Sequence, residues 1–239
     1  MHPFWRAQLF LFDKERRTTF SSQQGYRLLL IFLFMEGVVR PLFVASSRWL
    51  NITKLTWWPL IHVSFLTILV CLLVINFAKV SFSQLGLYSW SHWSKTEKFY
   101  FLQTIPLAII IFSFFRSASL KALWAHHDLI EIGLFIFIPE IIWGFYQELL
   151  YRGLLQNILV RRWGTFPGIM VSNLIFTFGP LHAYHFLSAQ KNPSHLWIFA
   201  AIFAVGLLFA ILYKRSGNLW IIGIMHGLGD WFIQGLDKV

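Results

Sequence analysis

Two stretches of this sequence, Trp57 to Ala78 and Trp163 to Gln190, contain no Asp, Glu, Lys or Arg. Each is longer than the roughly 20 helical residues that cross a hydrocarbon core of about 30 Å. A helix in water needs a polar face, so a soluble protein rarely contains two such stretches. The composition agrees, because 57% of the 239 residues are hydrophobic and only 13% are charged. We therefore expect an all-α integral membrane protein.

The apolar segments predict a bundle of about seven transmembrane helices, within a range of six to eight. The segments fall at about 27–47, 56–78, 99–117, 129–152, 165–188, 196–213 and 218–236. The more polar residues 79–98 are expected to form a loop with a short interfacial helix. Residues 1–25 have the pattern of a basic amphipathic segment that lies at the membrane surface. Residues 26–239 are expected to form a single transmembrane domain.

The formal net charge of +10 does not indicate nucleic acid as a partner. The basic residues stand between apolar runs, where they orient the chain and contact anionic lipid headgroups. Their distribution over the loops predicts an N-terminus in the cytoplasm. The short loops favour a prokaryotic plasma membrane over the endoplasmic reticulum membrane. The single cysteine, Cys71, lies in an apolar run and is expected to serve only in packing.

Ionisable residues inside membrane spans are costly, and they are functional candidates by default. Helical geometry places Glu148 and Arg152 on one face, one turn apart, and Gln147 above Tyr151 on the adjoining face. Glu148 and Arg152 can form a bidentate ion pair that keeps the carboxylate charged. A salt bridge that only closes the end of a helix is the alternative interpretation.

Two later spans carry further polar groups. His182 follows Pro180, which removes a helix hydrogen bond and predicts a kink. His226 and Asp230 are four residues apart in an otherwise uncharged stretch, so the imidazole and the carboxylate can pair. Three spans that each carry a polar group predict one shared site. Glu36 and Arg40 of the first span are expected to form a structural ion pair.

Glutamate and histidine together can deprotonate water, which is the general-base step of hydrolysis. A second histidine, oriented by Asp230, can stabilise an oxyanion. No serine or cysteine accompanies a base, which disfavours an acyl-enzyme. No cofactor is expected. Metal binding stays open, because His182, His226, Asp230 and Glu148 are competent ligands, although no compact ligand spacing such as HExxH is present.

The order of these segments resembles the CAAX protease and bacteriocin-processing (CPBP, Abi) family of intramembrane endopeptidases. That family shows Glu-Glu-x-x-x-Arg, then Phe-x-x-x-His, then His-x-x-x-Asn or His-x-x-x-Asp. The matching segments here are Gln147-Glu148-x-x-x-Arg152, Phe178-x-x-x-His182 and His226-x-x-x-Asp230. The resemblance covers about residues 140–232.

The resemblance implies a glutamate-dependent endopeptidase in which the first Glu of the pair and His182 activate water. His226, supported by Asp230, would stabilise the oxyanion, and Arg152 would anchor Glu148. The first Glu of the pair is Gln147 in this chain, and an amide cannot take the proton of water. Three explanations stay open: a deliberate Glu-to-Gln change that disables the enzyme, a takeover by Glu148 after a helix rotation of about 100°, or a natural non-catalytic member.

We therefore expect an intramembrane endopeptidase that cuts near the C-terminus of a membrane-anchored, lipidated or tail-signal-bearing protein. Its partners would be membrane lipids and that protein or peptide substrate. The alternatives are a non-catalytic peptide-binding or immunity protein on the same scaffold, and a proton-coupled transporter.

Overall fold

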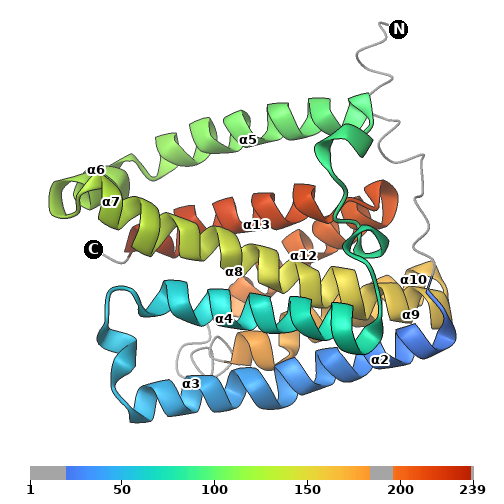
Figure 1. The fold of residues 1–239 in the computed structure, drawn as a ribbon. Helices are drawn as coiled ribbons and strands as arrows, with labels where there is room; N and C mark the ends of the chain where they lie inside the picture. Colours follow the sequence, from blue (N-terminus) through green and yellow to red (C-terminus); the bar gives the residue numbers. More distant parts are fainter. Residues whose placement is uncertain (1–19, 184–195, 238–239) are drawn as a thin grey trace, which may run out of the picture.

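The computed structural model describes residues 20–183 and 196–237, and every regular element in these ranges is a helix (Figure 1). Five helical stretches are long and apolar enough to cross a membrane: Ser22–Trp49, Trp58–Ala78, Lys95–Phe115, Leu129–Trp163 and Leu196–Ser216. A sixth apolar helix, Leu219–Ile233, is shorter. The described residues are all-helical, and the chain is a multi-pass integral membrane protein, as the apolar segments predicted.

The first span joins α2 (Ser22–Phe34), a π-helical turn η1 (Met35–Val39) and α3 (Arg40–Trp49). Its start is set by a capping box: the Ser21 hydroxyl accepts from the backbone N–H of Gln24, and the Gln24 side chain accepts from the backbone N–H of Ser21. The helix therefore begins inside the predicted 1–25 surface segment. Residues 1–19 of that segment lie outside the described residues.

The second span, α4 (Trp58–Leu73) with the π-helical turn η3 (Val74–Ala78), has an apolar face turned outward. Its exposed large side chains include Ile61, Phe65, Ile68 and Leu72, which follow helical spacing. The opposite face buries Val63, Leu66 and Val70. Both faces are apolar, so the outer one is suited to contact with lipid rather than water.

Residues 79–98 contain two short 3-10 helices, η4 (Phe82–Leu85) and η5 (Trp90–His92), and form the predicted loop with short helical turns. The loop is fixed to the far end of the chain, because the Leu219 N–H donates to the Gly86 carbonyl (3.0 Å). Gly86 has φ +89°, and a Cβ there would collide with the Gly217 carbonyl oxygen. This close approach explains the glycine.

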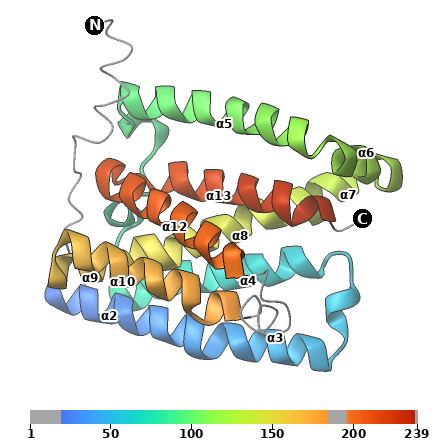
Figure 2. The ribbon, with the colours of Figure 1, turned by 180° about the vertical axis from the view of Figure 1, so that it is seen from behind.

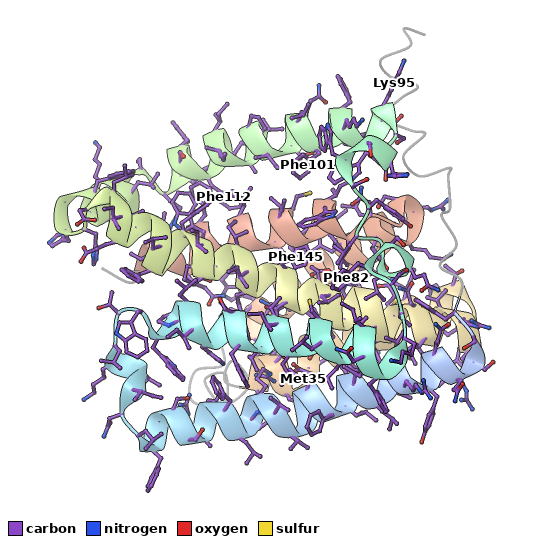
Figure 3. The ribbon with its side chains drawn as sticks, viewed as in Figure 1. Met35, Phe82, Lys95, Phe101, Phe112 and Phe145 are labelled. Atoms are coloured by element: carbon purple, nitrogen blue, oxygen red, sulfur yellow. The ribbon has the colours of Figure 1, made fainter. Side chains whose placement is uncertain are left out.

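The loop leads to α5 (Lys95–Phe115) and α6 (Ser117–His126). In Figure 1, α5 is the uppermost helix, and its side chains are largely exposed. It packs against α13 (Leu219–Ile233). There the ring of Phe112, which is labelled in Figure 3, stacks on Phe232 with centroids 5.1 Å apart. Helix α5 is therefore a peripheral, lipid-facing element.

The longest span joins five elements: α7 (Leu129–Glu131), η6 (Ile132–Phe137), α8 (Ile138–Glu148), η7 (Leu149–Gln156) and α9 (Asn157–Trp163). Helix α8 lies at the centre of the bundle, between α13 and α4 (Figures 1 and 2). The turn η7 is π-helical and follows directly after Glu148. Such turns add a residue to the helical repeat and often occur at functional sites.

The chain then forms α10 (Thr165–Phe178), the 3-10 turn η8 (Pro180–His182), α12 (Leu196–Ser216), α13 and the turn η10 (Gly235–Asp237). Helices α10 and α12 pack against each other and are seen best from behind (Figure 2). The fifth predicted span, 165–188, is helical in α10 only up to Phe178. Its last residues lie outside the described part of the chain.

Candidate active site

The site is built on the crossing of α8 and α13, the most extensive helix contact in the described fold. Glycines let the two backbones touch: a Cβ on Gly144 would collide with the backbone of Gly227, and a Cβ on Gly227 would lie 2.5 Å from Ile141 Cα. Because no side chain separates the helices here, short side chains from one helix can reach those of the other. Gln147 and Glu148 lie one turn beyond Gly144 on α8.

Glu148 is fully buried and contacts an imidazole on one side and a guanidinium on the other. Its Oε1 lies 2.7 Å from His226 Nδ1 on α13, and its Oε2 lies 3.3 Å from Arg152 Nε. The Glu148 side chain has an exposed fraction of 0%. A carboxylate this deep is stable as an anion only with such partners. The predicted Glu148–Arg152 ion pair is therefore confirmed, and it belongs to a larger set.

The bidentate geometry expected for Arg152 is wrong. Its Nη2 turns away from Glu148 and donates to the Gly206 carbonyl on α12 (2.8 Å) and to Asn173 Oδ1 on α10 (3.4 Å). Its guanidinium also lies over the ring of Phe176, 4.7 Å from the centroid. Because these three residues hold the guanidinium, its Nη2 hydrogen bonds go to α10 and α12, and its Nε lies 3.3 Å from the carboxylate. Arg152 thus links α8 to α10 and α12 at the depth of Glu148.

Asp230 and His226 lie on the same face of α13, as their spacing predicted, with His226 Nε2 3.7 Å from Asp230 Oδ2. The Asp230 carboxylate also accepts hydrogen bonds from two amides: Gln147 Nε2 on α8 (3.1 Å) and Gln234 Nε2 (3.5 Å). His226 is therefore placed between two carboxylates, with Glu148 at Nδ1 and Asp230 beyond Nε2. Gln147 is directly engaged with Asp230.

His182 lies beside the group formed by Gln147, Glu148, Arg152, His226 and Asp230 rather than within it. Its Nδ1 is 2.7 Å from the Phe176 carbonyl, an acceptor that fixes the hydrogen on Nδ1. Its ring packs edge-on against the Phe176 ring (4.9 Å), which also packs against His226 (6.0 Å). The half-buried His182 thus shares one aromatic neighbour with His226 and Arg152.

The kink expected at Pro180 is not formed. Helix α10 ends at Phe178, where Gly179 adopts an extended backbone, and Pro180 begins the separate 3-10 turn that carries His182. Proline ends the helix here because it lacks the N–H that the next hydrogen bond needs. His182 is consequently held on a turn at the end of α10.

The predicted ion pair of the first span is confirmed, but its partners were missed. Arg40 Nη2 lies 3.0 Å from Glu36 Oε2, and Glu36 also accepts from the hydroxyls of Tyr151 (2.9 Å) and Tyr146 (3.5 Å). Both tyrosines are buried in the same span as Glu148. The only sequence signal was their position, since Tyr146 directly precedes the Gln147–Arg152 segment and Tyr151 lies within it. The first span is thereby fastened to the segment that carries the candidate site.

Asn173 and Gly206, which hold Arg152, were also missed. Neither has a side chain that suggests chemistry, and the Gly206 contact is made by its backbone carbonyl. Within residues 20–183 and 196–237, no group of three or more His, Cys, Asp or Glu side chains is arranged to hold a metal ion. In these ranges the candidate site consists of carboxylates that contact amides and imidazoles.

Comparison with protein families identifies this part of the chain. Residues 129–232 match the family model described as "Type II CAAX prenyl endopeptidase Rce1-like". These residues form a domain of that family. The match spans α7 to α13 and includes all six candidate residues, close to the range of about 140–232 that the motifs had indicated. No curated protein and no solved structure matches the chain.

Proposed function

We propose that this chain is an intramembrane endopeptidase that hydrolyses a peptide bond near the C-terminus of a membrane-anchored, lipidated or tail-signal-bearing protein. Membership of residues 129–232 in a protease family supports a protein substrate. The observation that carries the proposal is the buried Glu148–His226 contact of 2.7 Å, with Asp230 on the far side of the same imidazole. A carboxylate-oriented imidazole beside a second acid provides two groups that can exchange a proton with water or with a leaving amine.

Each side chain has a defined task in this proposal. Arg152 places its Nε 3.3 Å from the Glu148 carboxylate, and Glu148 accepts the Nδ1 hydrogen of His226, which directs Nε2 of that ring toward Asp230. His182 holds its own Nδ1 hydrogen against a carbonyl, so its Nε2 carries the lone pair in the neutral ring. Two imidazoles joined by Phe176 can then serve the attacking water and the developing oxyanion.

A groove at the end of the helix that precedes His182 suits a lipid anchor on the substrate. It lies between the end of α10 and the start of α12, has a volume of about 430 Å³ and is lined by Phe178, Leu196, Phe199, Ala200 and Phe203. Because the lining is apolar, a hydrocarbon chain would bind there in preference to a charged peptide.

A second candidate function is a protein on the same scaffold that binds peptides without cutting them. Gln147 favours it, because the amide is neutral and its Nε2 already donates to Asp230. On this alternative, Gln147 disables hydrolysis and the chain serves as a binding or immunity protein. A proton-coupled transporter is a third candidate, and the intramembrane carboxylates and imidazoles of α8 and α13 favour it.

The test uses the full chain reconstituted in liposomes with a panel of membrane-anchored peptides that end in different C-terminal tails. Mass spectrometry of the products is expected to show one cut near the C-terminus, and His226→Gln is expected to abolish it. His62→Gln, at a histidine of α4 outside the site, serves as the control.

Cleavage that persists in His226→Gln would refute the proposed site. Peptide binding without cleavage, both in this chain and in Gln147→Glu, would favour the binding protein. Uptake of solutes into the liposomes without cleavage would favour the transporter.

A further inference from the structure

We infer that Asp230 supplies the water-activating carboxylate in this chain, so that the acid and the amide of one helix-to-helix pair have exchanged places. The inference rests on the proposed endopeptidase function. Gln147 on α8 and Asp230 on α13 form a carboxamide–carboxylate hydrogen bond of 3.1 Å. A chain with Glu at position 147 and Asn at position 230 would form the same pair with the charge on the opposite helix.

The two acids that contact His226, Glu148 and Asp230, differ in the exposed fraction of their side chains. The side chain of Glu148 has an exposed fraction of 0%, with Oε1 against His226 and Oε2 facing Arg152. The Asp230 side chain is 11% exposed, and that of His226 is 13% exposed. A general base must come within hydrogen-bond reach of the water that it deprotonates. Asp230 meets this condition, whereas Glu148 is enclosed by its partners and orients His226.

The hydrogen-bond partners of Asp230 leave its carboxylate able to accept a proton. Gln147 and Gln234 donate neutral hydrogen bonds to its two oxygens, and they hold the carboxylate in place without neutralising it. His226 Nε2 lies 3.7 Å from Oδ2, which is too far for a direct hydrogen bond. A water molecule can reach both of these atoms at that spacing. Asp230 Oδ2 and His226 Nε2 therefore face the same point, next to the partly exposed surfaces of these two side chains.

The step balances without a further reactant. Asp230 takes one proton from water as the water oxygen bonds to the carbonyl carbon of the peptide. When the tetrahedral intermediate collapses, the C–N bond breaks, and Asp230 returns the proton to the leaving nitrogen. Gln147 keeps its hydrogen bond to Asp230 and positions the carboxylate throughout. The neutral residue at position 147 is then compatible with an active enzyme.

The experiment places Glu at position 147 and Asn at position 230, singly and together. Four full-length proteins are compared in the liposome assay: the chain itself, Asp230→Asn, Gln147→Glu and the double variant Gln147→Glu/Asp230→Asn. Since general-base catalysis contributes about 10²–10⁴-fold, we expect Asp230→Asn to lose at least about 100-fold in kcat. The double variant should recover to within about tenfold of the original chain. Gln147→Glu alone sets two carboxylates against each other, and it should be slower than the double variant.

Glu97→Gln is the matched control, because Glu97 is equally buried on α5 and contacts Asn218 instead of the site. Its rate should match that of the unaltered chain. Thermal unfolding and peptide binding are measured for every variant, so that loss of fold is distinguished from loss of chemistry. If Asp230→Asn does not fold, the comparison of Gln147→Glu with the double variant decides the matter alone.

Two results would overturn the inference while leaving the endopeptidase intact. One is an Asp230→Asn protein that cuts at the original rate. The other is a Gln147→Glu protein that cuts faster than both the unaltered chain and the double variant, which would show that Gln147 disables the enzyme. Absence of cleavage in all four proteins, including the double variant, would overturn the proposed function and this inference together.

Discussion

Replacement of Gly227 by alanine tests whether the α8–α13 crossing holds the site together. A Cβ at this position would lie 2.5 Å from Ile141 Cα, 2.9 Å from the Ile141 carbonyl oxygen and 3.0 Å from the Glu140 carbonyl oxygen. Carbon atoms pack at about 3.5–4.0 Å, so the two backbones must separate by about 1 Å. All three neighbours are backbone atoms and cannot rotate away.

The same displacement would break the contacts of the site. The Glu148–His226 distance of 2.7 Å and the Gln147–Asp230 distance of 3.1 Å would both exceed the limit for a hydrogen bond. Overpacking of this kind costs about 1–3 kcal/mol. At about 2–4 °C per kcal/mol for a chain of this size, the Tm of Gly227→Ala should fall by about 2–12 °C. A 1 Å misplacement should also reduce cleavage by about 100-fold.

The measurement is thermal unfolding in one detergent, followed by tryptophan fluorescence, together with the cleavage rate in liposomes. Gly229→Ala is the control: it lies on the same helix, and its Cβ would have nothing within 4 Å. Alanine favours a helix over glycine by about 1 kcal/mol, so this variant should be as stable as the original or slightly more so. Equal Tm values for Gly227→Ala and Gly229→Ala would refute the close-contact argument.

Two further predictions concern buried charges and hydrogen bonds. Glu148→Gln leaves Arg152 fully buried without its counter-charge and should destabilise the fold by about 3–5 kcal/mol. Arg161→Gln, at an exposed arginine, should change the stability little. Comparable losses of stability for the two variants in unfolding experiments would contradict the buried ion pair. Tyr151→Phe removes a 2.9 Å hydrogen bond to the carboxylate of the first span and should cost about 1.5–3 kcal/mol. Tyr146→Phe removes a 3.5 Å contact and should cost less, so the opposite order would count against this geometry.

The sequence by itself determined the features that depend on neighbours along one helix. Long uncharged runs required membrane helices, because only a helix satisfies its own backbone in lipid. Spacing of four residues placed Glu36 beside Arg40, Glu148 beside Arg152 and His226 beside Asp230, and the structure contains all three pairs. These pairs follow from the helical repeat alone, which is why they could be predicted.

Only the tertiary structure decided which helices meet and how closely. The bonds from Gln147 to Asp230 and from Glu148 to His226 join residues 83 and 78 positions apart. They form because glycines on α8 and α13 let the two backbones touch, a property of the pair of helices that neither sequence segment contains. For the same reason Arg152 could not be placed correctly: its Nη2 is taken by a backbone carbonyl of α12, which no local pattern reveals.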